Sequence, residues 1–417
     1  MKDIIDNELT GHLGLASGSL LIVTVILGSG ILVLPGLVFA KIGGDGIYVW
    51  VACSLLSAPI LATMVILGSA YPSAGGVAYY AKLAFGQYLE LLVSMLFLGA
   101  VILGLPSIAI VGSAYLQKLT WPGVDVHLIA ALLILLAGFF ALSAGETFRS
   151  GVKLVGGWSL SLLVGALFVL IVLAIRANGV RFGRPSDFPS IASQIPLIFF
   201  SFTGWEIASH LSADFRNPKR DFGRAMVFAF ILICAVYVGS AALVHIADIK
   251  SNFNVPIFQA AAQIAPSAPH WLVPVLGVSL VAANLFGSVV AVSRLVFYLS
   301  RRHFLPASLG CLHNGAPRNS VYCVAAALII VVACDQIGLL NIELMFSLAG
   351  MNFLAIYVVS AIALVRLRQG LVSRLLAAVI VIPAVLIILG AGVSLPYIAF
   401  IALIAIFLNR NNRAELT

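Results

Sequence analysis

The sequence predicts an all-α integral membrane protein with twelve transmembrane helices. Of its 417 residues, 62% are hydrophobic and only 9% are charged, and the mean hydropathy is +1.14. A soluble chain of this length carries far more charge, whereas apolar runs of about 20 residues are long enough to cross a bilayer as helices. The five cysteines are scattered and form no CxxC pair, so neither a disulfide framework nor a zinc site is indicated.

The apolar runs are separated by short polar segments, and none of these segments is long enough for an independent soluble domain. Residues 1–12 carry Asp3, Asp6 and Glu8 against a single lysine, which is unlike a secretory signal peptide. The predicted spans are 13–40, 46–70, 86–117, 127–145, 152–175, 193–212, 223–247, 271–299, 319–335, 339–365, 373–391 and 394–409.

The distribution of basic residues predicts the orientation of the chain. With the N-terminus in the cytoplasm, only six of the 23 lysine and arginine residues fall in outside segments. Because cytoplasmic loops are enriched in these residues, we expect a multi-pass protein of the cell inner (cytoplasmic) membrane with both termini inside. The formal charge of +8 is then a topology signal and not a nucleic-acid footprint. The outside residues are Lys41, Lys118, Arg176, Arg181, Arg184 and Lys250.

The first apolar run is interrupted at its centre by Gly28-Ser29-Gly30, with Pro35 further on. Glycine is unfavourable inside a helix, and proline removes a backbone donor. In hydrocarbon the freed backbone groups are tolerated only where the break is buried in protein or lines a cavity. The triplet therefore predicts a broken helix whose second half presents bare N–H groups to an anion. A packing kink is the alternative, because glycine is common in membrane helices.

A second interruption lies in the sixth span, where Gly204 marks the expected unwinding point within Ser201-Phe202-Thr203-Gly204-Trp205-Glu206. A carboxylate inside a span costs at least about 2.5–3.5 kcal/mol, so Glu206 is a functional candidate. The alternative is a buried carboxyl that only fixes helix packing. The two broken helices begin two blocks of five spans, and an odd number of spans inverts the second block, as in transporters built from inverted repeats.

This symmetry predicts the organisation of the chain. It comprises a cytoplasmic N-terminus at 1–12, a first inverted repeat at 13–175, a second at 193–367, two further spans at 373–409 and a cytoplasmic C-terminus at 410–417.

Several motifs occur in the order and spacing of one known family. They are the GSG break at 28–30, YPSAGG at 71–76, FFSFTGWE at 199–206, NPKRD at 217–221, and SR followed by RRHFLP at 293–306. With these motifs the chain resembles the amino acid–polyamine–organocation superfamily over nearly its whole length. Within it, YPSAGGVA, the GLP of the third span and SHLSADFRNPKRDFGRAM are especially similar to bacterial inner-membrane exporters of L-methionine and branched-chain amino acids.

The resemblance implies a substrate site between broken helices one and six. The substrate carboxylate would meet Ser29 and the amides of Gly30 and Ile31, while its ammonium would meet carbonyls freed in both breaks, since opposite helix-dipole ends face the two ends of a zwitterion. An apolar pocket would receive the side chain. The residues implied in substrate binding are Ile26, Gly28, Ser29, Gly30, Ile31, Ala100, Val101, Leu105, Phe199, Phe200, Phe202, Thr203 and Gly204, and Glu206 is the candidate for proton coupling.

The sequence departs from some members of the superfamily at the coupling ion. Those members place a lysine in mid span five, where its ammonium replaces a sodium ion, but here the region reads Gly157-Trp158-Ser159-Leu160-Ser161. Glu206 is therefore the stronger candidate for the coupling proton. A sodium site that retains Ser161 is the alternative.

The expected function is secondary active efflux of L-methionine, leucine, isoleucine and valine in exchange for protons, with amino acid uptake as the alternative. A channel fits two broken helices and one buried acid less well. No enzyme is expected, because no GxxxxGK[ST], HExxH or GxSxG motif occurs. The expected partners are amino acids, protons and the lipid bilayer, with no nucleic acid, cofactor or metal, and no feature specifies an oligomeric state.

Overall fold

The computed structural model describes residues 13–28, 30–73, 75–119, 123–143, 146–180, 183, 185, 187–313, 316–392 and 394–415. The predicted N-terminus at 1–12, Ser29, Arg181 and Arg184 lie outside these residues. Within the described chain nearly everything is helical, and β-structure is limited to isolated bridges.

The helices follow one another closely along the chain. They are α1 (Leu15–Ile26), α2 (Gly30–Ile42), η1 (Gly43–Asp45), α3 (Gly46–Ala70), α4 (Gly76–Phe85), α5 (Gln87–Gln117), α6 (Val126–Ser143), α7 (Glu146–Asn178), α8 (Phe188–Phe199), η2 (Phe200–Phe202), α9 (Trp205–His210), η3 (Leu211–Asp214), η4 (Pro218–Phe222), α10 (Gly223–Ala247), α11 (Pro256–Ile264), α12 (Leu272–Arg301), η5 (Ala307–Gly310), α13 (Arg318–Gln336), α14 (Ile342–Leu367), α15 (Leu371–Gly390) and α16 (Ser394–Glu415).

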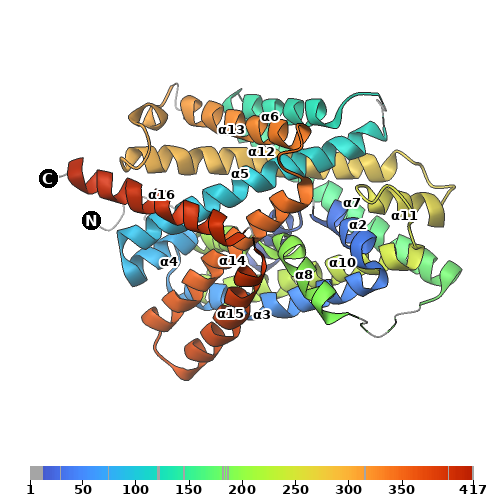
Figure 1. Cartoon of the computed structure of the whole chain (residues 1–417), viewed down its shortest axis with the longest axis horizontal. Helices are drawn as coiled ribbons and strands as arrows, with labels where there is room; N and C mark the ends of the chain where they lie inside the picture. Colours follow the sequence, from blue (N-terminus) through green and yellow to red (C-terminus); the bar gives the residue numbers. More distant parts are fainter. Residues whose placement is uncertain are drawn as a thin grey trace.

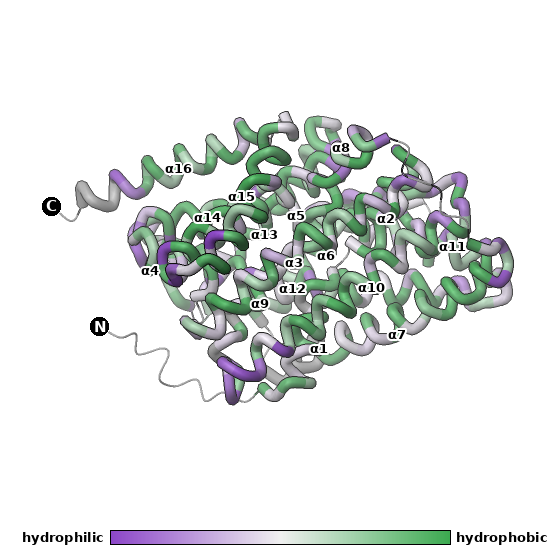
Figure 2. The backbone as a smooth tube through the Cα atoms, turned by 90° about the horizontal axis from the view of Figure 1, so that it is seen from below, coloured by the Kyte–Doolittle hydropathy of each residue, from purple (hydrophilic) through white to green (hydrophobic). Residues whose placement is uncertain are grey.

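Hydrophobic residues run along nearly every helix, while hydrophilic residues gather at helix ends and loops (Figure 2). Nine helical stretches of the described chain are long and apolar enough to cross a membrane, and three shorter apolar helices accompany them. The predicted all-α membrane class is therefore confirmed. The exact division into twelve spans and two inverted repeats stays a prediction.

The centre of the bundle is formed by α5 and α14. In each of these helices 72% of the most apolar window is buried, against 28% in α15. Helix α5 packs against α14 and α12, and α14 also packs against α8 and α15, in a bundle whose longest helices run along the long axis of Figure 1. The outer helices leave large apolar side chains exposed, such as Leu375, Val379 and Leu386 of α15, as a lipid-facing surface requires.

Two helices lie outside the predicted spans. Helix α4 follows the YPSAGG turn, in which Gly76 adopts φ +51°, and α11 begins at Pro256 between α10 and α12. Proline is favoured in the first turn of a helix because its missing N–H is not needed there. Helices of nine or ten residues are too short to cross a bilayer, so a search for spans does not find them.

A short parallel bridge joins the residue before α1 to the segment after α9. The amide of Leu13 donates to the carbonyl of Asp214 at 2.9 Å, and the amide of Arg216 donates to the carbonyl of Leu13 at 3.1 Å. The ring of Phe215 packs against Gly18, where a Cβ atom would lie 2.3 Å from the Phe215 Cζ. Helices α1 and α9 are thus tied together by main-chain bonds at this end.

The crossing of α14 over α8 depends on Gly350, and this gives a prediction for stability. A Cβ atom at Gly350 would lie 2.8 Å from the carbonyl oxygen of Pro196 and 3.1 Å from the amide nitrogen of Phe200. Because overpacking costs about 1–3 kcal/mol, we expect Gly350→Ala to lower the melting temperature of the detergent-solubilised protein. The melting temperature is measured as the loss of the folded peak in size-exclusion chromatography after heating to a series of temperatures.

Gly287→Ala in α12 is the matched control, because no heavy atom lies within 4 Å of its added Cβ. This control should melt at the wild-type temperature or slightly above it. Equal melting temperatures for Gly350→Ala and the wild type would contradict the close approach of the two helices.

Candidate functional site

The first break separates α1 from α2. Helix α1 ends at Ile26, Leu27 leaves the helical region with φ −70° and ψ 86°, and the amide of Gly28 turns back to the carbonyl of Ile26 at 2.8 Å. Helix α2 then begins at Gly30. The interruption therefore falls at the predicted GSG triplet, although its central residue, Ser29, is outside the described chain.

The second break separates α8 from α9. After α8 the chain makes one 3₁₀ turn, Thr203 is extended (φ −94°, ψ 170°), and Gly204 adopts φ +107° and ψ −10°. A side chain would be strained at this positive φ, so glycine is the residue that allows the backbone conformation between η2 and α9. The unwinding point predicted at Gly204 is confirmed.

The two breaks lie against each other. A Cβ atom at Gly30 would lie 2.3 Å from the Ser201 hydroxyl, and a Cβ atom at Gly204 would lie 3.0 Å from Cγ1 of Ile26. At both positions the absence of a side chain thus permits the close approach of the two breaks. Two segments more than 170 residues apart in the sequence meet at one point inside the bundle.

A cavity of about 90 Å³ lies between the breaks. Its walls come from both breaks and from α5, α10, α12 and α14. The lining residues are Ile26, Gly28, Gly30, Ala100, Val101, Gly104, Leu105, Ile108, Phe200, Ser201, Thr203, Gly204, Glu206, Ile207, Tyr237, Asn284, Ser288 and Phe353.

Nine of the thirteen residues implied in substrate binding line this cavity, and a tenth, Ser29, lies outside the described residues. The other three, Ile31, Phe199 and Phe202, are not among the lining residues and are buried, with at most 1% of their surface exposed. The Phe202 ring packs between Trp50 and Tyr237, at centroid distances of 6.1 and 5.2 Å. Phe200 is therefore the aromatic wall from this break, and the structure places Phe202 behind it.

Polar residues of α12 were missed by the sequence reasoning. Asn284 and Ser288 lie one helical turn apart and both face the cavity. An amide within an apolar span is the same kind of signal that singled out Glu206, and it could have identified Asn284. Ser161, the residue of the alternative sodium site, is exposed and its hydroxyl bonds back to the carbonyl of Gly157 at 2.9 Å.

Glu206 is held by the backbone of the break and by one side chain of α14. Both carboxylate oxygens accept the amide hydrogen of Gly204 at 3.0 Å, and the hydroxyl of Tyr357 donates to Oε2. Only 2% of Glu206 is exposed, and none of the ion pairs in the described chain involves it. A buried carboxyl with such partners is both a structural cap and a candidate proton carrier.

The carbonyls expected to meet an ammonium already accept hydrogen bonds. The carbonyl of Ile26 accepts from the Gly28 amide and from the hydroxyl of Tyr237 at 3.3 Å. The carbonyl of Phe200 accepts from the amide and the hydroxyl of Thr203, the latter at 2.7 Å. An incoming ammonium has to share or displace these bonds.

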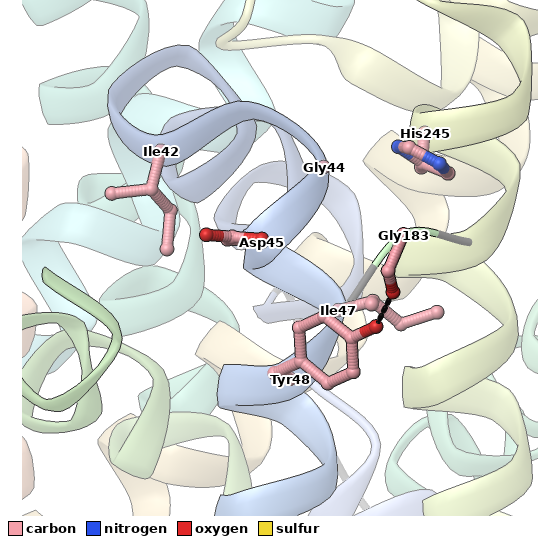
Figure 3. A pocket seen from close by; sticks show the side chains of 7 residues that line it. All are labelled: Ile42, Gly44, Asp45, Ile47, Tyr48, Gly183 and His245. Atoms are coloured by element: carbon pink, nitrogen blue, oxygen red, sulfur yellow. Dashed lines mark hydrogen bonds between the residues drawn. The ribbon is translucent and has the colours of Figure 1, made fainter. Parts of the chain in front are cut away.

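A larger cavity, of about 240 Å³, lies at the far end of α2 and is shown in Figure 3. The hydroxyl of Tyr48 donates to the carbonyl of Gly183 across it. It contains no residue of either break, so we place the candidate site in the smaller, central cavity. The residues around the larger one are Ile42, Gly44, Asp45, Ile47, Tyr48, Gly183 and His245.

A bundle of apolar helices, two of them interrupted at one central cavity, defines a membrane transporter. The family model for amino acid permeases matches residues 13–413. The chain therefore belongs to the amino acid permease family, within the amino acid–polyamine–organocation superfamily.

Known relatives match most of the chain. It is 29% identical over 381 residues to the L-methionine/branched-chain amino acid exporter of Escherichia coli (strain K12), covering 88% of each chain. It is 21% identical over 392 residues to a branched-chain amino acid permease of Bacillus subtilis (strain 168), covering 87% of this chain and 82% of the relative. It is 23% identical over 385 residues to the serine/threonine exchanger of the same organism, covering 85% and 84%. The family and these relatives are transporters and not enzymes.

The different positions of Phe200 and Phe202 give a prediction. We expect Phe200→Ala to change the relative competition by valine, leucine and methionine, because it removes a cavity wall. Phe202→Ala should instead lower thermal stability, since emptying a packed aromatic site costs about 3–5 kcal/mol. Competition assays and melting curves on both variants check this. An altered substrate preference in a stable Phe202→Ala protein would place Phe202 in the site after all.

Proposed function

We propose that this protein is a secondary active transporter that exports L-methionine, leucine, isoleucine and valine in exchange for protons. The observation that carries the substrate class is the wall of the central cavity. Its side chains from α5 and α14 are apolar, namely Ala100, Val101, Leu105, Ile108 and Phe353. Such a wall suits an apolar side chain. The one carboxylate among the lining residues, Glu206, already accepts hydrogen bonds from Gly204 and Tyr357 and is not free to pair with a cationic side chain.

Two relatives bear on the direction of transport. The similarity to the Escherichia coli exporter supports efflux. The Bacillus subtilis relative is a branched-chain amino acid permease, a name that gives no direction, so it is compatible with the alternative, uptake by a proton symporter or exchanger. A carrier runs in whichever direction its gradients drive it, so direction is decided by transport measurements in cells.

In the proposed binding mode the substrate carboxylate lies at the beginning of α2. The helix dipole favours an anion there, as do the amides of Gly30 and Ile31, which belong to the first turn and so have no acceptor within the helix. Ser29, which the resemblance implies as a further contact, lies outside the described residues. The ammonium meets the carbonyls of Ile26, Phe199, Phe200 or Thr203, and Glu206 carries the coupling proton.

The proposed arrangement in the membrane has twelve spans, with α1 and α2 forming the first and α8, η2 and α9 forming the sixth. Residues 13–175 and 193–367 are then two inverted repeats, residues 373–409 add two spans, and both termini face the cytoplasm. Its setting is the inner membrane, which the bacterial permease family supports.

Counterflow in proteoliposomes tests the proposed function. Vesicles loaded with unlabelled leucine should take up external labelled leucine faster than empty vesicles, because a loaded carrier returns its site more readily than an empty one. Methionine, isoleucine and valine should compete, and lysine and glutamate should not. Uptake without any acceleration by internal leucine would indicate a channel, and acceleration by lysine would contradict the apolar cavity.

A substitution at Glu206 tests the coupling proton. Glu206→Gln keeps the shape and a hydrogen bond but cannot titrate, so we expect it to retain leucine exchange and to lose acceleration by an imposed pH gradient. Glu343→Gln is the matched control, because Glu343 pairs with Lys41 at the surface and exposed ion pairs contribute little. A wild-type response to the pH gradient in Glu206→Gln would place the coupling proton elsewhere, and a dependence on sodium would overturn proton coupling.

A further inference from the structure

The hydroxyl of Ser201 is a buried polar group without a partner. Ser201 lies in the 3₁₀ turn η2 and is 3% exposed, and its Oγ forms no hydrogen bond within the described chain. Buried hydroxyls nearly always have a partner, so an unpaired one in a native site calls for an explanation. Ser201 also lines the central cavity, where a ligand can reach it.

Tyr237 is the nearest candidate for an internal partner. Its hydroxyl donates to the carbonyl of Ile26 at 3.3 Å, and the Oγ of Ser201 has no hydrogen-bond partner of acceptable geometry among the described residues. The Ser201 hydroxyl therefore keeps its proton available.

Ser201 lies in η2, and its hydroxyl is next to the first residue of α2. Its Oγ would lie 2.3 Å from a Cβ atom added to Gly30, the first residue of that helix. The first amides of a helix have no partner within the helix and carry the positive end of its dipole. A hydroxyl beside them adds a donor from the other broken helix, so that donors from both breaks converge on one point.

We propose that the Ser201 hydroxyl donates a hydrogen bond to the α-carboxylate of the transported amino acid, beside the amides at the start of α2. This inference rests on the proposed function, because it assumes that an amino acid occupies the central cavity. It adds a carboxylate-recognising side chain from η2, in the other broken helix, to the contacts proposed above from the start of α2. It also explains why position 30 is glycine, since any side chain there would displace the Ser201 hydroxyl.

The experiment compares analogues of leucine that lack one charged group each. Leucinamide has the ammonium but no carboxylate, and 4-methylpentanoate has the carboxylate but no ammonium. In the proteoliposome assay, Ser201→Ala should weaken leucine and 4-methylpentanoate by roughly tenfold to hundredfold, the usual range for a lost hydrogen bond to a charged group. Inhibition by leucinamide should weaken by a smaller factor, about twofold to tenfold, because its amide oxygen accepts only a neutral hydrogen bond from the hydroxyl.

Ser107→Ala is the matched control. Ser107 is a fully buried serine of α5 whose hydroxyl donates to the carbonyl of Leu103 at 3.0 Å, and it does not line the cavity. It should leave all three affinities unchanged. Ser201→Cys, which keeps the size but donates weakly, should reproduce the loss for leucine and serves as the readout if Ser201→Ala does not fold.

Three other outcomes would contradict either the Ser201 contact or the proposed function. Equal weakening of leucine and leucinamide, matched by Tyr237→Phe, would show that Ser201 supports Tyr237 and does not contact the carboxylate. Unchanged leucine affinity in a folded Ser201→Ala protein would remove the contact while leaving the proposed function intact. Absence of leucine counterflow in the wild type would overturn the proposed function and this inference with it.

Discussion

Main-chain hydrogen bonding inside a bilayer is the constraint on which this structure depends. Hydrocarbon supplies no water to an open N–H or C=O group, so each interrupted helix needs partners from the protein. The Tyr237 hydroxyl reaches the carbonyl of Ile26 in the first break, and the carboxylate of Glu206 takes the amide of Gly204 in the second. The neighbouring helices therefore supply hydrogen bonds that each break needs. Tyr237 belongs to α10, and Tyr357 of α14 donates to the Glu206 carboxylate.

The role of Glu206 follows from this constraint. Its carboxylate closes the backbone where α9 begins, so a change in its charge acts on the break itself and not only on a neighbouring ligand. The two alternatives weighed from the sequence, a packing carboxyl and a proton carrier, are therefore compatible in one residue.

The sequence predicts well what hydropathy and single special residues decide. Long apolar runs became helices, and Gly30 and Gly204 mark the two interruptions because each tolerates what a side chain cannot. The short helices α4 and α11 and the direction of Phe202 were not predictable in the same way. One 3₁₀ turn in η2 rotates successive side chains differently from an α-helix, so Phe200 faces the cavity and Phe202 faces Trp50.

Contacts between distant segments also escape a single sequence. The residues next to Asn284, Tyr237 and Ser201 in the sequence do not show that these three share a cavity. The cavity exists only once α5, α10 and α12 have packed around both breaks. The glycines within the apolar runs located the breaks, and the structure located the side chains that surround them.

The bridge between Leu13 and Phe215 has a consequence for substitutions at this end. Its bonds are made by main-chain atoms, so the connection between the segment before α1 and the segment after η3 does not depend on which side chains these segments carry. A substitution at Leu13 or Phe215 changes the packing around the bridge and leaves its two hydrogen bonds available. Only a proline at Leu13 or Arg216 would remove one of the two donors.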